Sequence, residues 1–301
     1  MKRIVMLSFE ILPSLVGYIL CALAIVHALL DSKDNRIQRL LMLFILFIYG
    51  TFLEFMGVTN GHYHYATDFL MILEVVPLPV SLAWVGIIYS VMIIAERLEL
   101  KTWQRIIATS LIALSLDWGM DPVAVELGLW TWETDRGEYF GVPGFNFFGW
   151  FFIPIAFLIA YGLGWEQENK RFKLYTIHEI DEIHSLSRKL YTLLLVIPIS
   201  IGILVIVGII SLNPFIYYMP FIGLVIWAIL TVLIATFLIL WKHNSLKREK
   251  AFDLIPPCVL LYIGFNYALY GFLIGRFDLG FLMLLAGIPL WLVFIFTFIK
   301  R

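Results

Sequence analysis

Apolar blocks of about 20 residues recur along almost the whole of this chain of 301 residues. A helix of that length rises about 30 Å, which matches the hydrocarbon core of a bilayer. Hydrophobic residues make up 61% of the chain and charged residues only 14%, so a water-soluble fold of this length could not bury its apolar surface. The pattern therefore predicts an all-α, polytopic transmembrane helical bundle with lipid as its solvent.

The number of apolar blocks predicts about nine spans (eight to nine) within a single integral membrane domain, residues 1–301. The expected spans cover residues 10–30, 37–57, 72–95, 103–121, 145–164, 189–211, 216–241, 253–274 and 280–299. The first block runs too long for a signal peptide and lacks a small-residue cleavage site, so we interpret it as a helix. No linker is long enough to separate two domains.

Lysine and arginine alternate between the two ends of the expected spans. Seventeen of the 21 lie in the odd-numbered loops and at the C-terminus: Lys33, Arg36, Arg39, Arg97, Lys101, Arg105, Lys170, Arg171, Lys173, Arg188, Lys189, Lys242, Lys247, Arg248, Lys250, Lys300 and Arg301. The other four are Lys2, Arg3, Arg136 and Arg276. Because basic loops stay on the cytoplasmic face, we expect a multi-pass plasma-membrane protein with its N-terminus outside and its C-terminus in the cytoplasm.

Three carboxyl groups are expected deep in the bilayer, near its outer side. By helix rise, Glu54 lies about 22 Å from Arg39. Asp117 and Asp121 lie about 18 Å and about 24 Å from Arg105. If the arginines mark the inner interface, all three carboxyls fall within the core. An ionisable group there costs at least about 2.5 kcal/mol and usually serves a function.

Asp117 and Asp121 are spaced i, i+4, so they share one face of a helix that Pro122 is expected to end. Two carboxyls close together at low dielectric cannot both ionise cheaply, so one is expected to hold a proton at neutral pH. The alternative is structural, with the aspartates capping helix ends or bonding to Trp, Tyr and Asn side chains. Pro77 and Pro79 are expected to kink the third span beside this site.

The histidine count argues against an iron oxygenase. The chain has only six, too few for the clustered boxes that hold two irons: His27, His62, His64, His178, His184 and His243. His62 and His64 lie nearest the carboxyls, where hydrogen bonding is a simpler role than metal binding. Walker, GxGxxG, GxSxG and HExxH motifs are absent, and a net charge of −1 offers no basic surface for nucleic acid. We therefore expect chemistry without a cofactor or a metal.

Motif residues surround these carboxyls. They are Glu54-x-x-Gly57, Gly61-x-Tyr63-x-Tyr65, Val76-Pro77 to Ala83-Trp84, Asp117-x-x-x-Asp121-Pro122-Val123-Ala124, Gly128-x-Trp130-x-Trp132 and Tyr139-x-Gly141-Val142-Pro143-x-x-Asn146-x-x-Gly149-Trp150. This part of the chain, about residues 50–155, resembles the membrane carotenoid hydratases of the carotenoid 1,2-hydratase and bisanhydrobacterioruberin hydratase type. The loop at Thr59-Asn60-Gly61 is shorter than in that family, and the last four spans resemble it in character only.

The resemblance implies addition of water across a trisubstituted isoprenoid double bond, at a carotenoid end group, to give a tertiary alcohol. Asp117 or Asp121 would be the acid that forms a tertiary cation, with Glu54 as its partner. Aromatic rings would stabilise the cation through their faces, or else form an interfacial belt. The residues expected to bind the substrate are Thr59, Asn60, Tyr63, Tyr65, Trp84, Trp118, Trp130, Trp132 and Asn146.

The expected partners are a long apolar isoprenoid from the bilayer, water and membrane lipids. Two other interpretations stay open. The same chemistry would also act on the geranylgeranyl chains of archaeal ether lipids, which the shortened loop favours. In a proton-coupled transporter or a noncatalytic lipid-binding protein, the buried carboxyls would instead carry protons or only structure. Transport needs a proton gradient, whereas hydration proceeds in detergent without one.

The charge distribution predicts a topology that reporter fusions can test. A reporter fused after Arg301 should be cytoplasmic, and one inserted near Arg136 should be extracytoplasmic, because the basic loops alternate along the chain. Reporters that locate both positions on one side of the membrane would make the predicted number of spans wrong.

Overall fold

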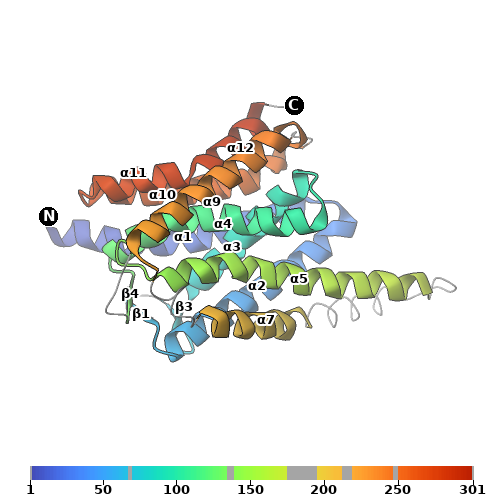
Figure 1. The fold of residues 1–301 in the computed structure, drawn as a ribbon, viewed down its shortest axis with the longest axis horizontal. Coiled ribbons are helices and arrows are strands. Elements are labelled where there is room, and N and C mark those ends of the chain that lie inside the picture. Colours follow the sequence, from blue (N-terminus) through green and yellow to red (C-terminus); the bar gives the residue numbers. More distant parts are fainter. Residues whose placement is uncertain are drawn as a thin grey trace.

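The computed structural model describes residues 2–66, 70–133, 139–174, 195–211, 219–246 and 250–299. Most of these residues are helical, and the helices pack side by side along the long axis of the molecule (Figure 1). The long helices are α1 (Lys2–Leu30), α2 (Lys33–Thr59), α3 (Leu78–Arg97), α4 (Thr102–Glu126), α5 (Gly144–Leu174), α7 (Val196–Ser211), α9 (Phe221–Lys242), α10 (Ile255–Leu273), α11 (Phe277–Ala286) and α12 (Ile288–Ile299). Two short 3-10 turns, His243–Ser245 and Ala251–Leu254, precede α10.

Each of the expected spans coincides with a helix or, for the last, with the pair α11 and α12, which is bent by 50°. Residues 189–194 and 216–218 of those spans lie outside the described residues. Within the described part of the chain, six helices are long and apolar enough to cross a membrane, or seven if the bent pair is one span. The expectation of a membrane helical bundle is therefore confirmed, while nine spans and the orientation of the termini stay predictions.

Helix α4 lies in the middle of the bundle, between α3, α5, α9, α10 and α11. Of its apolar stretch, 89% of the residues are buried inside the protein, against 22% for α9. The outward face of α9 instead carries exposed apolar side chains such as Ile222, Leu233 and Phe237. Apolar groups that face outward in this way suit a lipid solvent, whereas the polar residues of α4 are kept inside.

Two short antiparallel ribbons lie at one end of the bundle (Figure 1), and the all-α expectation missed them. Strand β1 (Tyr63–Tyr65) pairs with β4 (Trp130–Trp132), and β2 (Met71–Ile72) pairs with β3 (Val76–Pro77). The third span therefore begins at Leu78 rather than at residue 72. Proline suits the start of a helix because it lacks the N–H that would be unpaired there, so Pro77 and Pro79 start α3 and do not kink it.

The expectation that Pro122 ends its helix is wrong, because α4 continues to Glu126 with Pro122 inside it. Proline removes one backbone hydrogen bond, which a helix packed on all sides within a bundle can tolerate. Asp117 and Asp121 consequently lie within a continuous helix and not at its end.

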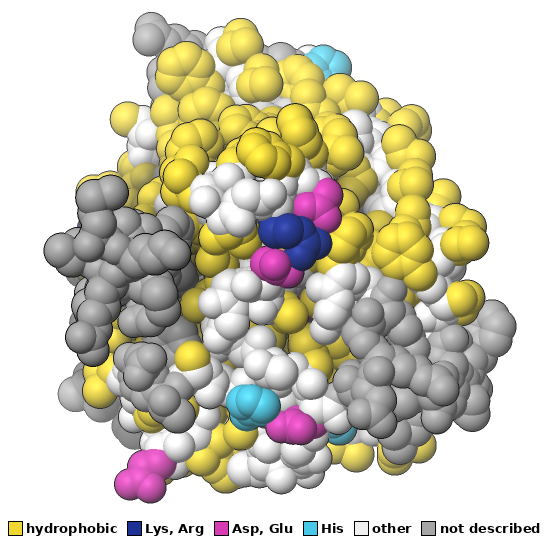
Figure 2. All heavy atoms as spheres, turned by 90° about the vertical axis from the view of Figure 1, so that its left-hand side faces the viewer, with side chains coloured by type: hydrophobic (Ala, Val, Ile, Leu, Met, Phe, Trp, Pro, Cys, Tyr) yellow, Lys and Arg dark blue, Asp and Glu magenta, His cyan; other side chains and the backbone are white. Residues whose placement is uncertain are grey.

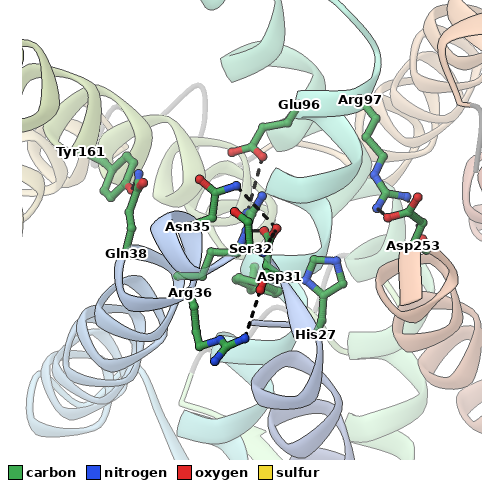
Figure 3. Close-up of polar contacts among 12 residues, drawn as sticks. His27, Asp31, Ser32, Asn35, Arg36, Gln38, Glu96, Arg97, Tyr161 and Asp253 are labelled. Atoms are coloured by element: carbon green, nitrogen blue, oxygen red, sulfur yellow. Dashed lines mark hydrogen bonds and ion pairs between the residues drawn. The ribbon is translucent and has the colours of Figure 1, made fainter. Parts of the chain in front are cut away.

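Ion pairs and hydrogen bonds join the helices at the end of the bundle opposite the ribbons (Figure 3). Arg39 of α2 bonds to Asp31, which precedes α2, and lies 3.6 Å from Glu96 of α3. Arg97 donates a 2.7 Å hydrogen bond to Asp253, before α10, and so joins the two halves of the chain. These contacts hold Arg39 and Arg97 at one end, and the site described next lies at the other.

Candidate functional site

A cavity of about 280 Å³ lies beside the ribbons. Its walls come from α1, α2, α3, α4, α5 and α10 and from the β1 and β4 strands. Most lining side chains are aliphatic or aromatic, and none of the lining residues that the structure describes is a lysine or an arginine. Figure 2 looks onto this end of the bundle, where few of the described side chains are charged. The cavity therefore suits an apolar ligand that approaches a small number of polar groups.

Glu54 is the polar centre of one wall and is only 6% exposed. Its Oε2 accepts hydrogen bonds from the hydroxyl of Tyr63, at 2.6 Å, and from the hydroxyl of Tyr65. Its Oε1 accepts a 2.5 Å bond from Nε1 of Trp84. Three neutral donors thus surround this carboxyl, and hydrogen bonds of this kind are strongest when the acceptor is ionised. Burial raises the pKa of the Tyr63 hydroxyl well above its ordinary value, so this donor keeps its proton.

The β1–β4 ribbon explains why two tyrosines reach the same carboxyl. Alternate residues of a strand point to one side, which turns Tyr63 and Tyr65 toward Glu54 together. The register places Tyr63 opposite Trp132 and Tyr65 opposite Trp130, with ring centroids 4.8 Å and 6.0 Å apart. Four aromatic rings from two distant segments therefore form one wall of the cavity.

Two glycines of α2 make room for these partners. A Cβ at Gly57 would lie 2.3 Å from the hydroxyl oxygen of Tyr63, and one at Gly50 would lie 2.7 Å from Cβ of Trp84. Both distances are shorter than side-chain atoms tolerate. The spacing of Glu54 and Gly57 in the sequence motif thus has a physical reason, because the carboxyl and its tyrosine share one helix face.

Asp117 and Asp121 form the second polar centre, and Asp121 lines the same cavity as Glu54. Asp117 is 0% exposed and Asp121 is 3% exposed, one turn apart on α4. A single nitrogen, Nδ2 of Asn146 in α5, donates to Oδ2 of both, at 3.0 Å to Asp117 and 2.6 Å to Asp121. Oδ1 of Asp117 is buried without a partner among the described residues. Asp121 lines the cavity, and Asp117 lies directly behind it.

Most of the residues expected at the site come together. Those that line the cavity are Glu54, Tyr63, Tyr65, Trp84, Asp121, Trp130, Trp132 and Asn146. Asp117 does not line the cavity itself, but it contacts Asn146 and Asp121, which do.

Three residues expected to bind the substrate lie elsewhere. Trp118 stacks on Phe147, with centroids 3.8 Å apart, because adjacent residues of a helix face directions about 100° apart. Thr59 donates its hydroxyl to the carbonyl of Phe55, and Asn60 is exposed at the end of α2. The structure therefore does not place Trp118, Thr59 or Asn60 in the cavity wall.

Other lining residues were not expected from the sequence. Trp150 of α5 stacks on Trp84 at 4.3 Å, and its i, i+4 spacing from Asn146 is a signal that could have revealed it. Phe145 lines the same wall. Tyr267 of α10 also lines the cavity, but it lies in an apolar span with no motif around it.

The two histidines of the short loop separate. His62 lines the cavity, with its ring centroid 5.6 Å from that of Phe145, and burial lowers the pKa of His62. His64 is exposed and pairs with Glu133 at 2.6 Å across the ribbon. Within the described ranges, no three His, Cys, Asp or Glu residues gather in a way that could hold a metal ion.

Fold and site together define a membrane-embedded helical protein in which buried carboxyls face an apolar, aromatic cavity. Comparison with known families makes this class more specific. The profile described as "Carotenoid biosynthesis protein" matches residues 13–212, and the chain belongs to this family. The resemblance noted over residues 50–155 lies within the matched range and is confirmed.

One relative carries the name bisanhydrobacterioruberin hydratase and comes from Haloarcula japonica. It is 24% identical to this chain over 177 residues, which are 56% of this chain and 59% of the relative. The alignment thus spans little more than half of either protein. No solved structure matches the chain.

Gly57→Ala should destabilise the site that Glu54 organises. The added methyl group would overlap the Tyr63 ring, and overpacking of this kind typically costs about 1–3 kcal/mol. We expect the midpoint of thermal unfolding in detergent to fall by several degrees. The matched control is Gly202→Ala on α7, where a Cβ meets nothing within 4 Å. Equal midpoints for the two variants would contradict the close packing of Tyr63 on α2.

Proposed function

We propose that this protein is a cofactor-independent hydratase that adds water across a trisubstituted isoprenoid double bond, at the end group of a carotenoid. The observation that carries the proposal is the pairing of Asp117 and Asp121 through Asn146, beside an apolar cavity that Asp121 and Glu54 both line. The family of the chain and the name of its haloarchaeal relative support a carotenoid as the substrate.

The aspartate pair supplies the acid. Two carboxylates that share one amide donor, with no cation in the described lining, repel each other strongly, so the pair keeps one proton. A neutral carboxylic acid in an apolar site is the kind of donor that can protonate an alkene. Asp121 lines the cavity and delivers the proton to the alkene. Asp117 does not line the cavity and is the carboxyl that shares the proton of the pair with Asp121.

The reaction proceeds through a tertiary cation. The alkene π electrons bond the proton to the less substituted carbon, and the other carbon becomes the cation. The oxygen of a water molecule bonds to that carbon and gives up a proton to a carboxylate, which restores the acid. The balance is one alkene plus one water to one tertiary alcohol.

Glu54 and the aromatic rings near it stabilise the cation. The three hydrogen bonds that Glu54 accepts favour its ionised form, and in this mechanism its negative charge offsets the positive charge of the cation. The rings of Trp130 and Trp132 line the same side, and a cation attracted to an aromatic face gains about 0.5–2 kcal/mol.

The cavity volume favours recognition of an end group. A water molecule occupies about 30 Å³, and a methyl or methylene group is of similar size, so about 280 Å³ holds roughly nine carbons, or about two isoprene units. The remainder of a carotenoid would lie outside the cavity, among lipids. The same argument admits the prenyl chain of an ether lipid, which ends in the same group, as the second candidate substrate.

The product identifies the reaction. The purified protein in detergent, given a linear carotenoid with a terminal isopropylidene group, should form an alcohol heavier by one water. It should do so without dioxygen or a proton gradient, and the new oxygen should come from labelled water, as mass spectrometry can measure. Label that arrives from dioxygen would end the hydratase hypothesis. Hydration of a geranylgeranyl ether lipid but not of the carotenoid would assign the second substrate.

Substitutions of the carboxyls test the acid. Asp121→Asn or Asp117→Asn keeps size and polarity but removes the proton, so product formation should fall by roughly 10²–10⁴-fold. Glu54→Gln should also lower it, because the cation loses its counter-charge. The measurement is product yield normalised to folded protein in membranes.

The control for these variants is Glu74→Gln. Glu74 is exposed in the β2–β3 turn near the same end and does not line the cavity. It should remain near wild-type activity. Near wild-type yield from all three site variants would mean that the proton donor lies elsewhere.

A further inference from the structure

Tyr267 is a polar side chain in the cavity wall that the carboxyl chemistry leaves unused. It belongs to α10, beyond the residues 13–212 that the family profile matches, and it is 7% exposed. Ile263, one turn earlier on α10, lines the cavity with it, so this face of the helix is part of the wall.

The hydroxyl of Tyr267 differs from those of Tyr63 and Tyr65, the other two tyrosines of the cavity, in having no hydrogen bond to a described residue. The tyrosines and the tryptophan at Glu54 are bonded to its carboxyl, and Asn146 is bonded to both aspartates. Among the described residues, no hydrogen bond involves Tyr267, which meets Tyr270 only through its ring, with centroids 6.0 Å apart. A polar ligand in the cavity, such as water, would give this hydroxyl the hydrogen bond that the described residues do not supply.

Asp121 is a carboxyl of the same cavity. It lies on α4, and α10, which carries Tyr267, packs against α4. A hydroxyl and a carboxyl that face one small cavity provide the two or more polar partners that an ordered water molecule needs.

We propose that Tyr267 binds the water molecule that captures the cation, and holds it beside Asp121. This inference rests on the proposed hydration. Asp121 first gives its proton to the alkene and becomes a carboxylate. The water held by Tyr267 then forms the C–O bond, and one of its protons returns to Asp121. The C-terminal helices thereby contribute a group that touches a reactant.

Tyr267→Phe in D2O separates water capture from protonation. The variant keeps the ring and the acid, so the cation still forms, but without a positioned water it reverts to alkene by losing a proton. The acid carries deuterium in D2O, so alkene recovered from the reaction should be deuterated. We expect the alcohol yield to fall at least about tenfold. The ratio of deuterium exchange to hydration should rise by a similar factor, as mass spectrometry of both compounds measures.

The control is Tyr270→Phe, the same change on the same helix. Tyr270 has a buried hydroxyl without a partner in the described part of the chain, but it does not line the cavity. Its ratio should equal that of the wild type. Because exchange and hydration are measured in one sample, the amount of folded protein cancels.

The remaining outcomes assign failure to one hypothesis or the other. An unchanged ratio in Tyr267→Phe, or a loss of exchange and hydration together, would overturn the role of Tyr267 while wild-type hydration stands. If the wild-type protein neither hydrates a carotenoid or an ether lipid nor incorporates deuterium into it, the proposed function is overturned, and this inference with it.

Discussion

Three carboxyl groups buried in an apolar bundle are the constraint on which the site depends. A charged or polar group at low dielectric must find hydrogen bonds inside the protein, because lipid offers none. Here the donors are neutral. Two tyrosines and a tryptophan donate hydrogen bonds to Glu54, and one asparagine donates to both Asp117 and Asp121. Neutral donors stabilise the carboxyls without cancelling their charge.

The partners come from separated parts of the chain, and the ribbon is what brings several of them together. Strand β1 follows α2, and β4 follows α4, so their pairing connects the helix that carries Glu54 with the helix that carries the aspartates. The same pairing places aromatic rings over the cavity. Gly57 allows one of those rings to lie against α2, so a small residue contributes to the site as much as a reactive one does.

The C-terminal helices complete the cavity although the family profile ends at residue 212. Helix α10 supplies Ile263 and Tyr267 to the wall, and it is joined to α3 at the opposite end of the bundle through Arg97 and Asp253. The matched region alone would leave one side of the cavity open. A site built across both halves of the chain explains why the C-terminal spans matter even where they resemble the family in character only.

Lipid-length apolar blocks and helical spacing are local properties, and the sequence determined them alone. They predicted the membrane helices and the shared face of Asp117 and Asp121, but not the β1–β4 ribbon that turns Tyr63 and Tyr65 toward Glu54. Only the tertiary structure decided that Trp118 faces Phe147, that Pro122 lies within its helix and that Tyr267 reaches the cavity. These depend on which helices pack against one another. In a chain this apolar, any helix face can either be buried in the bundle or meet lipid. Composition does not distinguish a buried face from a lipid-facing one, so only the packing of the helices decides.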